Sequence, residues 1–292
     1  MTTVIQRSAP EYPVRLARAP QPPAALFVRG ANPLPAAEFT VAIVGARAAR
    51  GQGMAVAHQM AADLSAAGAL VVSGGAVGID SAAHRGALDA GRPTVAVLAG
   101  GLDAPYPGRN RPLFDQIVAQ GGALVATEPP GTPPLRRLFV ARNAVIAGLC
   151  DAVVVVEADA GSGSMHTARA ALAAGRTLAA VPGSPACEAL LAQGAALVES
   201  AADLMEARAG RPRQPIARLP EPGSRAAMVL EALDGEAPRT GAAVAAQSGL
   251  ALRDTARALA GLELEGLALL LPGQAYLRSP LAERLRAGSE QE

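Results

Sequence analysis

The feature that most constrains the fold is a unit that recurs between residues 40 and 183. In each copy a short apolar run ends in a turn, and a helix-like segment and a glycine follow. After the first run, Val56, Met60 and Leu64 recur at helix spacing, and Gly68 suits the left-handed position after a helix. Strands that alternate with helices form βαβ crossovers, which build a mostly parallel sheet. The six apolar runs are "TVAIVG", "ALVVSG", "PTVAVLAG", "GALVAT", "CDAVVVVEAD" and "TLAAVPG".

The runs contain few polar residues, as expected for parallel strands that are covered by helices on both faces. The sequence therefore predicts an α/β fold: a Rossmann-like, doubly wound, mostly parallel sheet. The chain is 50% hydrophobic and only 17% charged, which agrees with a packed core and excludes long disorder.

The composition changes after about residue 206, where prolines, glycines and arginines crowd together. Beyond this segment the pattern is helix, helix, turn at Gly249, helix and a short β-ribbon near Gly273. This order predicts a small C-terminal winged-helix domain; the alternative is a helical interaction module that does not dock into DNA. The expected organisation is a lead-in segment 1–39, a Rossmann-like domain 40–206, a linker 207–223, a winged-helix-like domain 224–279 and a tail 280–292.

Several classes of protein are excluded or disfavoured. No apolar run reaches the ~18 residues of a membrane span, and the N-terminus lacks a signal-peptide pattern. Cys150 and Cys187 form neither a disulfide framework nor a metal-ligand spacing, and the three histidines have no cysteine or acidic cluster beside them. We expect a cytoplasmic protein without a metal and without membrane contact.

The loops that follow the predicted strands carry an excess of positive charge. In a parallel sheet these loops converge on one edge, where ligands bind. All 26 basic residues are arginines, and the net charge is only +1. The local excess indicates a phosphate-binding edge, although solvated loop arginines are the alternative. Between residues 104 and 150 five arginines, 109, 111, 136, 137 and 142, stand against Asp115 and Glu128.

The glycine turns do not fit a dinucleotide cofactor. A G-x-G-x-x-G fingerprint is absent from both "GARAARGQG" and "SGGAVGID", and Asp80 would repel a pyrophosphate. Backbone N–H groups at such turns can still bind the phosphates of a chain. We expect no cofactor. Asp80 is expected to cap a helix, and Glu128, Glu157 and Asp159 to orient Arg47 or Arg142 by ion pairs.

Five segments in the same order resemble the DNA-processing protein A (DprA/Smf) family, and the resemblance spans residues 11 to 279. It implies a homodimer that binds single-stranded DNA and loads the RecA recombinase onto it during natural transformation, without catalysis or cofactor. The N-terminal helical domain of some members is expected to be absent. The segments are "VAIVGARAA", "VVSGGAVGIDSAAHRGALDAG", "TVAVLAGGLDAPYPGRNRPLFDQI", "FVARNAVIAGLCDAVVVVEADAGSGSMHTARAAL" and "GRTLAAVPGS".

The resemblance also suggests which residues bind DNA. Val77 and Ala144 stand where the family usually has arginine, and its binding-pocket lysine has no counterpart in a chain without lysine. Arg109 is added for its charge and His166 for its place near the binding edge. The expected DNA-binding residues are Arg47, Ser73, Gly74, Gly75, Arg109, Asn110, Arg111, Arg142, Asn143, Ser162, Gly163, Ser164 and His166.

Two further expectations concern the dimer and an enzymatic alternative. An apolar series after the last strand is a candidate dimer interface, although these side chains could equally close the core. The rival function is a nucleotide phosphoribohydrolase, which needs a catalytic glutamate where this chain has Arg169. The interface candidates are Leu190, Leu191, Leu197, Val198 and Leu204.

Overall fold

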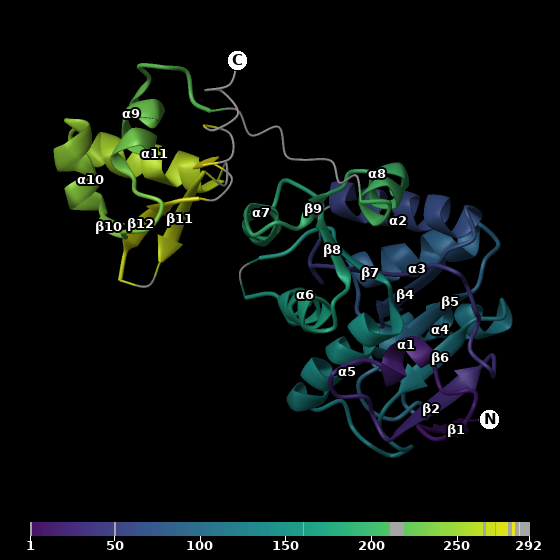
Figure 1. The fold of residues 1–292 in the computed structure, drawn as a ribbon. Coiled ribbons are helices and arrows are strands. Elements are labelled where there is room, and N and C mark those ends of the chain that lie inside the picture. Colours follow the sequence, from purple (N-terminus) through teal and green to yellow (C-terminus); the bar gives the residue numbers. More distant parts are fainter. Residues whose placement is uncertain are drawn as a thin grey trace. The chain divides into compact units, whose positions relative to one another are not determined.

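The computed structural model describes residues 2–49, 51–159, 161–210, 219–264, 267–271, 273–279, 282–283 and 286. These residues form two compact units, each with its own core (Figure 1). The first comprises the described residues of 1–187 and 195–213, and the second those of 188–194 and 214–292.

The first unit is built on a nine-stranded sheet, and its central strands are parallel. All six predicted strands are present, which confirms the Rossmann-like fold. The strand order is β1-β2-β6-β5-β4-β3-β7-β8-β9, so the direction of winding reverses between β3 and β7. At such a switch point the loops after the two strands diverge and leave room for a ligand. The six strands are β3 (Thr40–Val44), β4 (Leu70–Gly74), β5 (Thr94–Val97), β6 (Ala123–Ala126), β7 (Ala152–Val155) and β8 (Thr177–Ala180).

The segment 1–39 takes part in the same sheet. Its two strands, β1 (Thr3–Gln6) and β2 (Ala25–Gly30), pair antiparallel with each other, and β2 pairs antiparallel with β6. A short helix, α1 (Val14–Ala17), lies between them in the chain and packs against α5 (Arg136–Leu149). The lead-in therefore extends the sheet beyond β6. At the opposite edge a two-residue strand, β9 (Ala196–Leu197), pairs with β8.

Helices cover the sheet, and small side chains let them approach it closely. One core cluster joins α2 (Gly51–Ala66), α3 (Ile79–Asp89) and α8 (Ala201–Arg208) to β3 and β7. A second cluster surrounds Phe114 of α4 (Arg111–Ala119) and includes residues of β5 and β6. The remaining helix of this unit is α6 (Ser164–Ala173). Helix α7 (Pro185–Ala192) begins in the first unit, and its residues from 188 onward belong to the second. No described helix is long and apolar enough to cross a membrane.

The second unit has the predicted winged-helix order. The hydroxyls of Ser224 and Thr240 cap the first two helices, and Gly249, with φ of 72°, ends the second. Its core contains Val229 and Leu259. The linker 207–223 and the tail 280–292 lie partly outside the described residues, so the domain boundaries stay predictions. The elements are α9 (Arg225–Ala232), β10 (Arg239–Thr240), α10 (Gly241–Ser248), α11 (Leu252–Leu264), β11 (Ala268–Leu271) and β12 (Ala275–Arg278), with sheet order β10-β12-β11.

Candidate nucleic-acid interface

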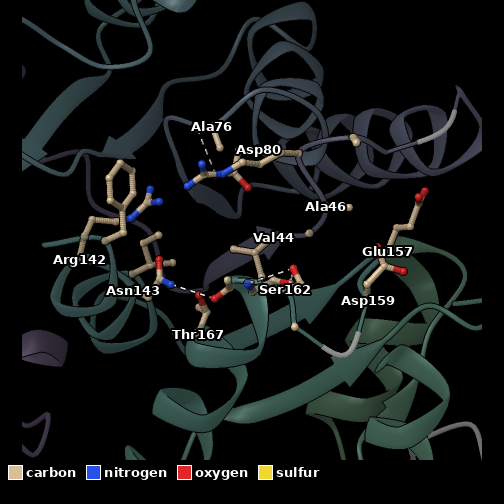
Figure 2. Close-up of a pocket in the computed structure, with 18 residues that line it drawn as sticks. Val44, Ala46, Ala76, Asp80, Arg142, Asn143, Glu157, Asp159, Ser162 and Thr167 are labelled. Atoms are coloured by element: carbon tan, nitrogen blue, oxygen red, sulfur yellow. Dashed lines mark hydrogen bonds between the residues drawn. The ribbon is translucent and has the colours of Figure 1, made fainter. Parts of the chain in front are cut away.

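A groove lies in the first unit beyond the carboxyl ends of β3, β4 and β7, at the predicted edge of the sheet. It consists of two adjoining cavities of about 400 and 340 Å³. The larger cavity is bounded by the loop after β3, by α5 and by the start of α6 (Figure 2). The smaller cavity is bounded by the glycine turn after β4 and by the loop that contains Tyr106 and Arg109. The residues that line both cavities are Arg47, Ala76, Phe139 and Arg142.

The ring of Phe139 forms the wall between the two cavities, and two guanidinium groups lie near it. One belongs to Arg47, after β3, and the other to Arg142, on α5. The Cζ atom of Arg47 lies 5.2 Å from the centroid of the Phe139 ring, and that of Arg142 lies 5.9 Å from it. Tyr106 meets the same ring edge-on at 6.1 Å between centroids. Cation–π contacts of this kind hold a guanidinium in place with its N–H groups free to act on other partners. We call these four residues the Phe139 stack.

Arg142 differs from Arg47 in its environment, because it is buried whereas Arg47 is exposed. One of its terminal nitrogens donates to the Val97 carbonyl at 2.8 Å, and its Nε atom has no hydrogen-bond partner among the described residues. Burial lowers the pKa of Arg142, the Asp80 carboxylate raises it, and Arg47 lowers it. Burial likewise raises the pKa of Asp80, while Arg142 opposes that rise. The two groups therefore form a buried pair in the wall of the larger cavity.

This pair corrects two predictions. Asp80 is not the cap of α3: the N-cap residue is Gly78, without a side-chain cap, and Asp80 instead accepts from the Ala76 N–H at 3.3 Å. Its carboxylate is also the one that stabilises charged Arg142, a role that the sequence analysis gives to Glu128, Glu157 or Asp159. Glu157 and Asp159 line the larger cavity.

The glycine turn after β4 is held from behind by side chains that reach it from other elements. The Nε2 atom of His84, on α3, lies 2.8 Å from the Gly74 carbonyl. Just before the turn, Ser73 of β4 donates to the Ile43 carbonyl of β3 at 2.6 Å. The Nδ2 atom of Asn110 donates to the carbonyls of Gly75 at 2.8 Å and Ala76 at 3.2 Å. A Cβ at Gly74 would collide with the guanidinium of Arg142 and the carboxylate of Asp80, so a larger residue would have to displace this buried pair.

The start of α6 forms the opposite wall of the larger cavity. Its N-cap is Gly163, without a side-chain cap hydrogen bond, and the hydroxyls of Ser162 and Ser164 lie 2.7 Å apart. The Nδ2 atom of Asn143 donates to the Gly163 carbonyl at 2.9 Å. The Ser164 N–H donates to the Ser162 hydroxyl at 3.4 Å, and the N–H groups of Met165 and His166 donate to backbone carbonyls. The start of the helix still carries the positive end of the helix dipole, which attracts anions.

The structure brings most of the predicted site residues to the groove but not all of them. Ser73, Gly74 and Asn110 lie behind it, and Arg111 and His166 are exposed on the first turns of α4 and α6 without lining either cavity. The predicted residues that line the groove are Arg47, Gly75, Arg109, Arg142, Asn143, Ser162, Gly163 and Ser164.

Sequence reasoning missed other lining residues. Ile146 and Thr167 also line the larger cavity, and each follows a predicted residue, Asn143 or Ser164, by three positions on its helix. Helix periodicity could therefore have found them. No local signal pairs Asp80 with Arg142, which are 62 positions apart in the sequence.

The candidate dimer residues are mostly inside the protein. Val198 and Leu204 are fully buried in the core cluster beneath β3 and β7, and Leu190 and Leu191 are buried too. Leu197 is half-buried in β9. Their placement favours the alternative that these side chains close the core, and the homodimer stays a prediction without an assigned surface.

The fold places the chain in the class of Rossmann-like proteins that also carry a winged-helix domain. It belongs to the DNA recombination-mediator protein A family, whose model matches residues 3–209. A putative DNA processing protein DprA from Mycobacterium tuberculosis is 43% identical over 262 residues, which cover 86% of this chain and 65% of that relative. The chain thus spans slightly less than two thirds of that relative's length.

Two solved structures agree with this family. DNA processing protein A from Streptococcus pneumoniae superposes with a TM-score of 0.64 at 36% identity, over 70% of this chain and 73% of that chain. A structure of DNA processing protein A from Helicobacter pylori, which concerns its single-stranded DNA binding mode, superposes with a TM-score of 0.64 at 26% identity, over 73% of this chain and 98% of that chain.

Proposed function

We propose that this chain binds single-stranded DNA in the groove and acts as a recombination mediator. The observation that carries the proposal is the Phe139 stack, in which Arg47 and Arg142 meet one aromatic ring between two cavities. The stack faces the start of α6 across the larger cavity. Guanidinium groups and the positive end of a helix both attract phosphate, so a phosphate chain is the ligand that uses them together.

The groove favours a single strand over a duplex. Its two cavities of about 400 and 340 Å³ are separated by Phe139, so neighbouring nucleotides would be held apart rather than stacked on each other. A stacked and paired duplex cannot adopt this arrangement without first being opened. Because the polar groups of the groove suit phosphates rather than base edges, binding is expected to depend little on base sequence.

The test is a fluorescence anisotropy titration with a labelled oligonucleotide, single-stranded and then annealed to its complement. We expect the parent protein to bind the single strand more tightly than the duplex. Arg47→Ala should bind the single strand more weakly, and the slope of its log affinity against log salt concentration should be smaller in magnitude by about 0.7. Arg92→Ala is the matched control, because Arg92 is exposed just before β5, at the opposite edge of the sheet. Equal affinity for both forms of DNA would refute the proposal.

Recombinase loading is the second part of the proposal, supported by the family to which the chain belongs. Once bound, the single strand would be passed to RecA by a homodimer of this protein. We expect the protein to shorten the lag of RecA filament formation on DNA covered by single-strand-binding protein, and Arg47→Ala to lose this effect. Light scattering at micromolar concentration tests the dimer, and a monomeric mass would remove it.

We propose that the protein acts without catalytic turnover and without a cofactor. A phosphoribohydrolase would need a glutamate at the position of Arg169, which is an exposed residue of α6. Incubation with nucleoside monophosphates should release no free base, and steady release would support the enzymatic alternative instead.

A further inference from the structure

Two buried asparagines stand behind the two backbone loops of the groove. Asn110 and Asn143 are 6% and 7% exposed, and each was expected to contact DNA. Their amides instead point at backbone carbonyls: Asn110 at Gly75 and Ala76, and Asn143 at Gly163. Since a carbonyl oxygen only accepts hydrogen bonds, the Nδ2 atom must be the one that faces the loop in each case.

We propose that Asn110 and Asn143 are positioning residues that hold these loops so that the Val77 N–H and the start of α6 face the ligand, a role that rests on the proposed function. In a planar trans peptide the carbonyl and the next N–H point in opposite directions. Holding the Ala76 carbonyl from behind therefore turns the N–H of Val77, which belongs to the same peptide, the other way. The Ala76 N–H donates to the Asp80 carboxylate and holds the turn from its other side. Ala76 lines both cavities and Val77 lines the smaller one.

Other side chains also form hydrogen bonds with the backbone carbonyls of the glycine turn. His84 holds the Gly74 carbonyl, and Ser81 donates to the Ala76 carbonyl at 2.7 Å. The Asn110 amide also lies 3.0 Å from the Ser81 hydroxyl, so the two side chains form one network beneath the turn. Three successive carbonyls, at residues 74 to 76, are thus tied to side chains.

Asn143 acts on the second loop by one bond. It fixes the Gly163 carbonyl, which belongs to the same peptide as the N–H of Ser164, the first residue of α6. This fixes the start of the helix, where the Ser164 N–H donates to the Ser162 hydroxyl at 3.4 Å. The positive end of the helix dipole is expected to attract phosphate there. The two asparagines come from η1 (Gly108–Asn110) and from α5, so both loops are held by elements outside themselves.

The first experiment measures backbone hydrogen exchange in the free protein, without DNA. In Asn110→Ala we expect exchange at residues 75 to 78 to become about tenfold faster, as the loss of roughly one buried hydrogen bond predicts. Val153→Ala is the control: it shortens a fully buried side chain on β7, two strands from β4, and should leave the turn unchanged. Unchanged exchange in Asn110→Ala would overturn the proposal.

The second experiment measures binding of a single-stranded oligonucleotide at several salt concentrations. Asn110→Ala should weaken binding about tenfold with the parent's salt slope, because no charge is lost, whereas Arg47→Ala lowers the slope. Ser81→Ala provides a second route if Asn110→Ala does not fold. Ser81 is buried and lines neither cavity, so weaker binding in that variant must act through the turn.

The outcomes separate the two proposals. Weaker binding with unchanged exchange would make Asn110 a direct DNA contact and overturn the positioning role. If the parent protein binds no DNA, the proposed function is wrong. Faster exchange in Asn110→Ala and Ser81→Ala would still show that these side chains hold the glycine turn in place. Asn143→Ala should give the same pattern at residues 162 to 166.

Discussion

The groove of the first unit and the winged unit both contain arginines, but these arginines make different contacts. In the groove, Arg47 and Arg142 flank an aromatic ring at the wall of two cavities. In the winged unit, Arg225 pairs with Asp254, and Arg278 pairs with Glu283 and donates to three backbone carbonyls. Arginine content alone therefore does not identify a DNA-binding surface, because acids and carbonyls can neutralise it.

The charge balance of the winged unit supports this contrast. Between residues 224 and 279 five arginines stand against six acids, which gives a net charge of −1. Its third helix, α11, carries Arg253 and Arg257 together with Asp254 and Glu263. Neutralisation of phosphates supplies most non-specific affinity for DNA, so a unit without excess positive charge is a poor duplex binder. We propose that it is a protein-contact or regulatory module.

The comparison is tested most strongly by separating the two units. A fragment of residues 1–210 should keep single-strand binding, because every residue of the groove lies within it. A fragment of residues 220–292 should not shift a labelled duplex in a gel at low salt. A clear shift would restore a docking role for α11 and remove the contrast.

A large effect is expected for Arg142→Ala. The substitution removes one of the two guanidinium groups of the Phe139 stack and leaves the buried Asp80 carboxylate without its partner. Loss of one partner lowers the free energy of unfolding by about 3–5 kcal/mol in comparable buried pairs. We expect lower stability in urea unfolding and strongly weakened DNA binding. The double variant Asp80→Asn with Arg142→Ala should recover part of the stability but not the binding. Recovery of both would show that Arg142 has only a structural role.

The two units should also differ in their response to acid, because all three histidines lie in the first one. Burial lowers the pKa of His84 from 6.5 to about 4; the hydrogen bond to the Gly74 carbonyl opposes this shift, and the charge of Arg142 contributes to it. Between these values the unfolded chain binds more protons, so the free energy of unfolding falls as the pH falls. From pH 7 to pH 5 the loss is about 2 kcal/mol, partly offset by Asp80, whose raised pKa acts in the opposite direction.

Urea unfolding of the 1–210 fragment at the two pH values measures this loss. His84→Gln is the matched variant, since its amide can still donate to the Gly74 carbonyl but does not titrate in this range. It should show a smaller pH dependence than the parent. An equal dependence in both proteins would assign the acid sensitivity to other groups.

The smallest effect is expected on the surface of α11. Arg253→Ala and Arg257→Ala each remove an exposed charge from a helix that we do not expect to touch DNA. Single-strand affinity of the full chain should change by less than about twofold, within the few tenths of a kcal/mol typical of surface substitutions. A tenfold loss for either variant would place the winged unit on the DNA.

Much of this molecule could be predicted from its sequence. The six central strands, the parallel sheet and the winged-helix order follow from local periodicity and from glycines, since these set the strands, helices and turns that a segment can form. The edge that carries the groove also follows, because parallel strands place their carboxyl ends together. The residues expected to bind DNA remain predictions.

Only the tertiary structure decided which side chains face the groove and which support it. Asp80 pairs with Arg142 rather than capping α3, Asn110 turns its amide to the glycine turn, and Leu204 fills the core instead of a surface. The segment 1–39 supplies strand β2, which pairs with β6, far away in the sequence. These outcomes depend on which distant residues become neighbours once the sheet is wound, and packing and burial then fix the direction of each side chain.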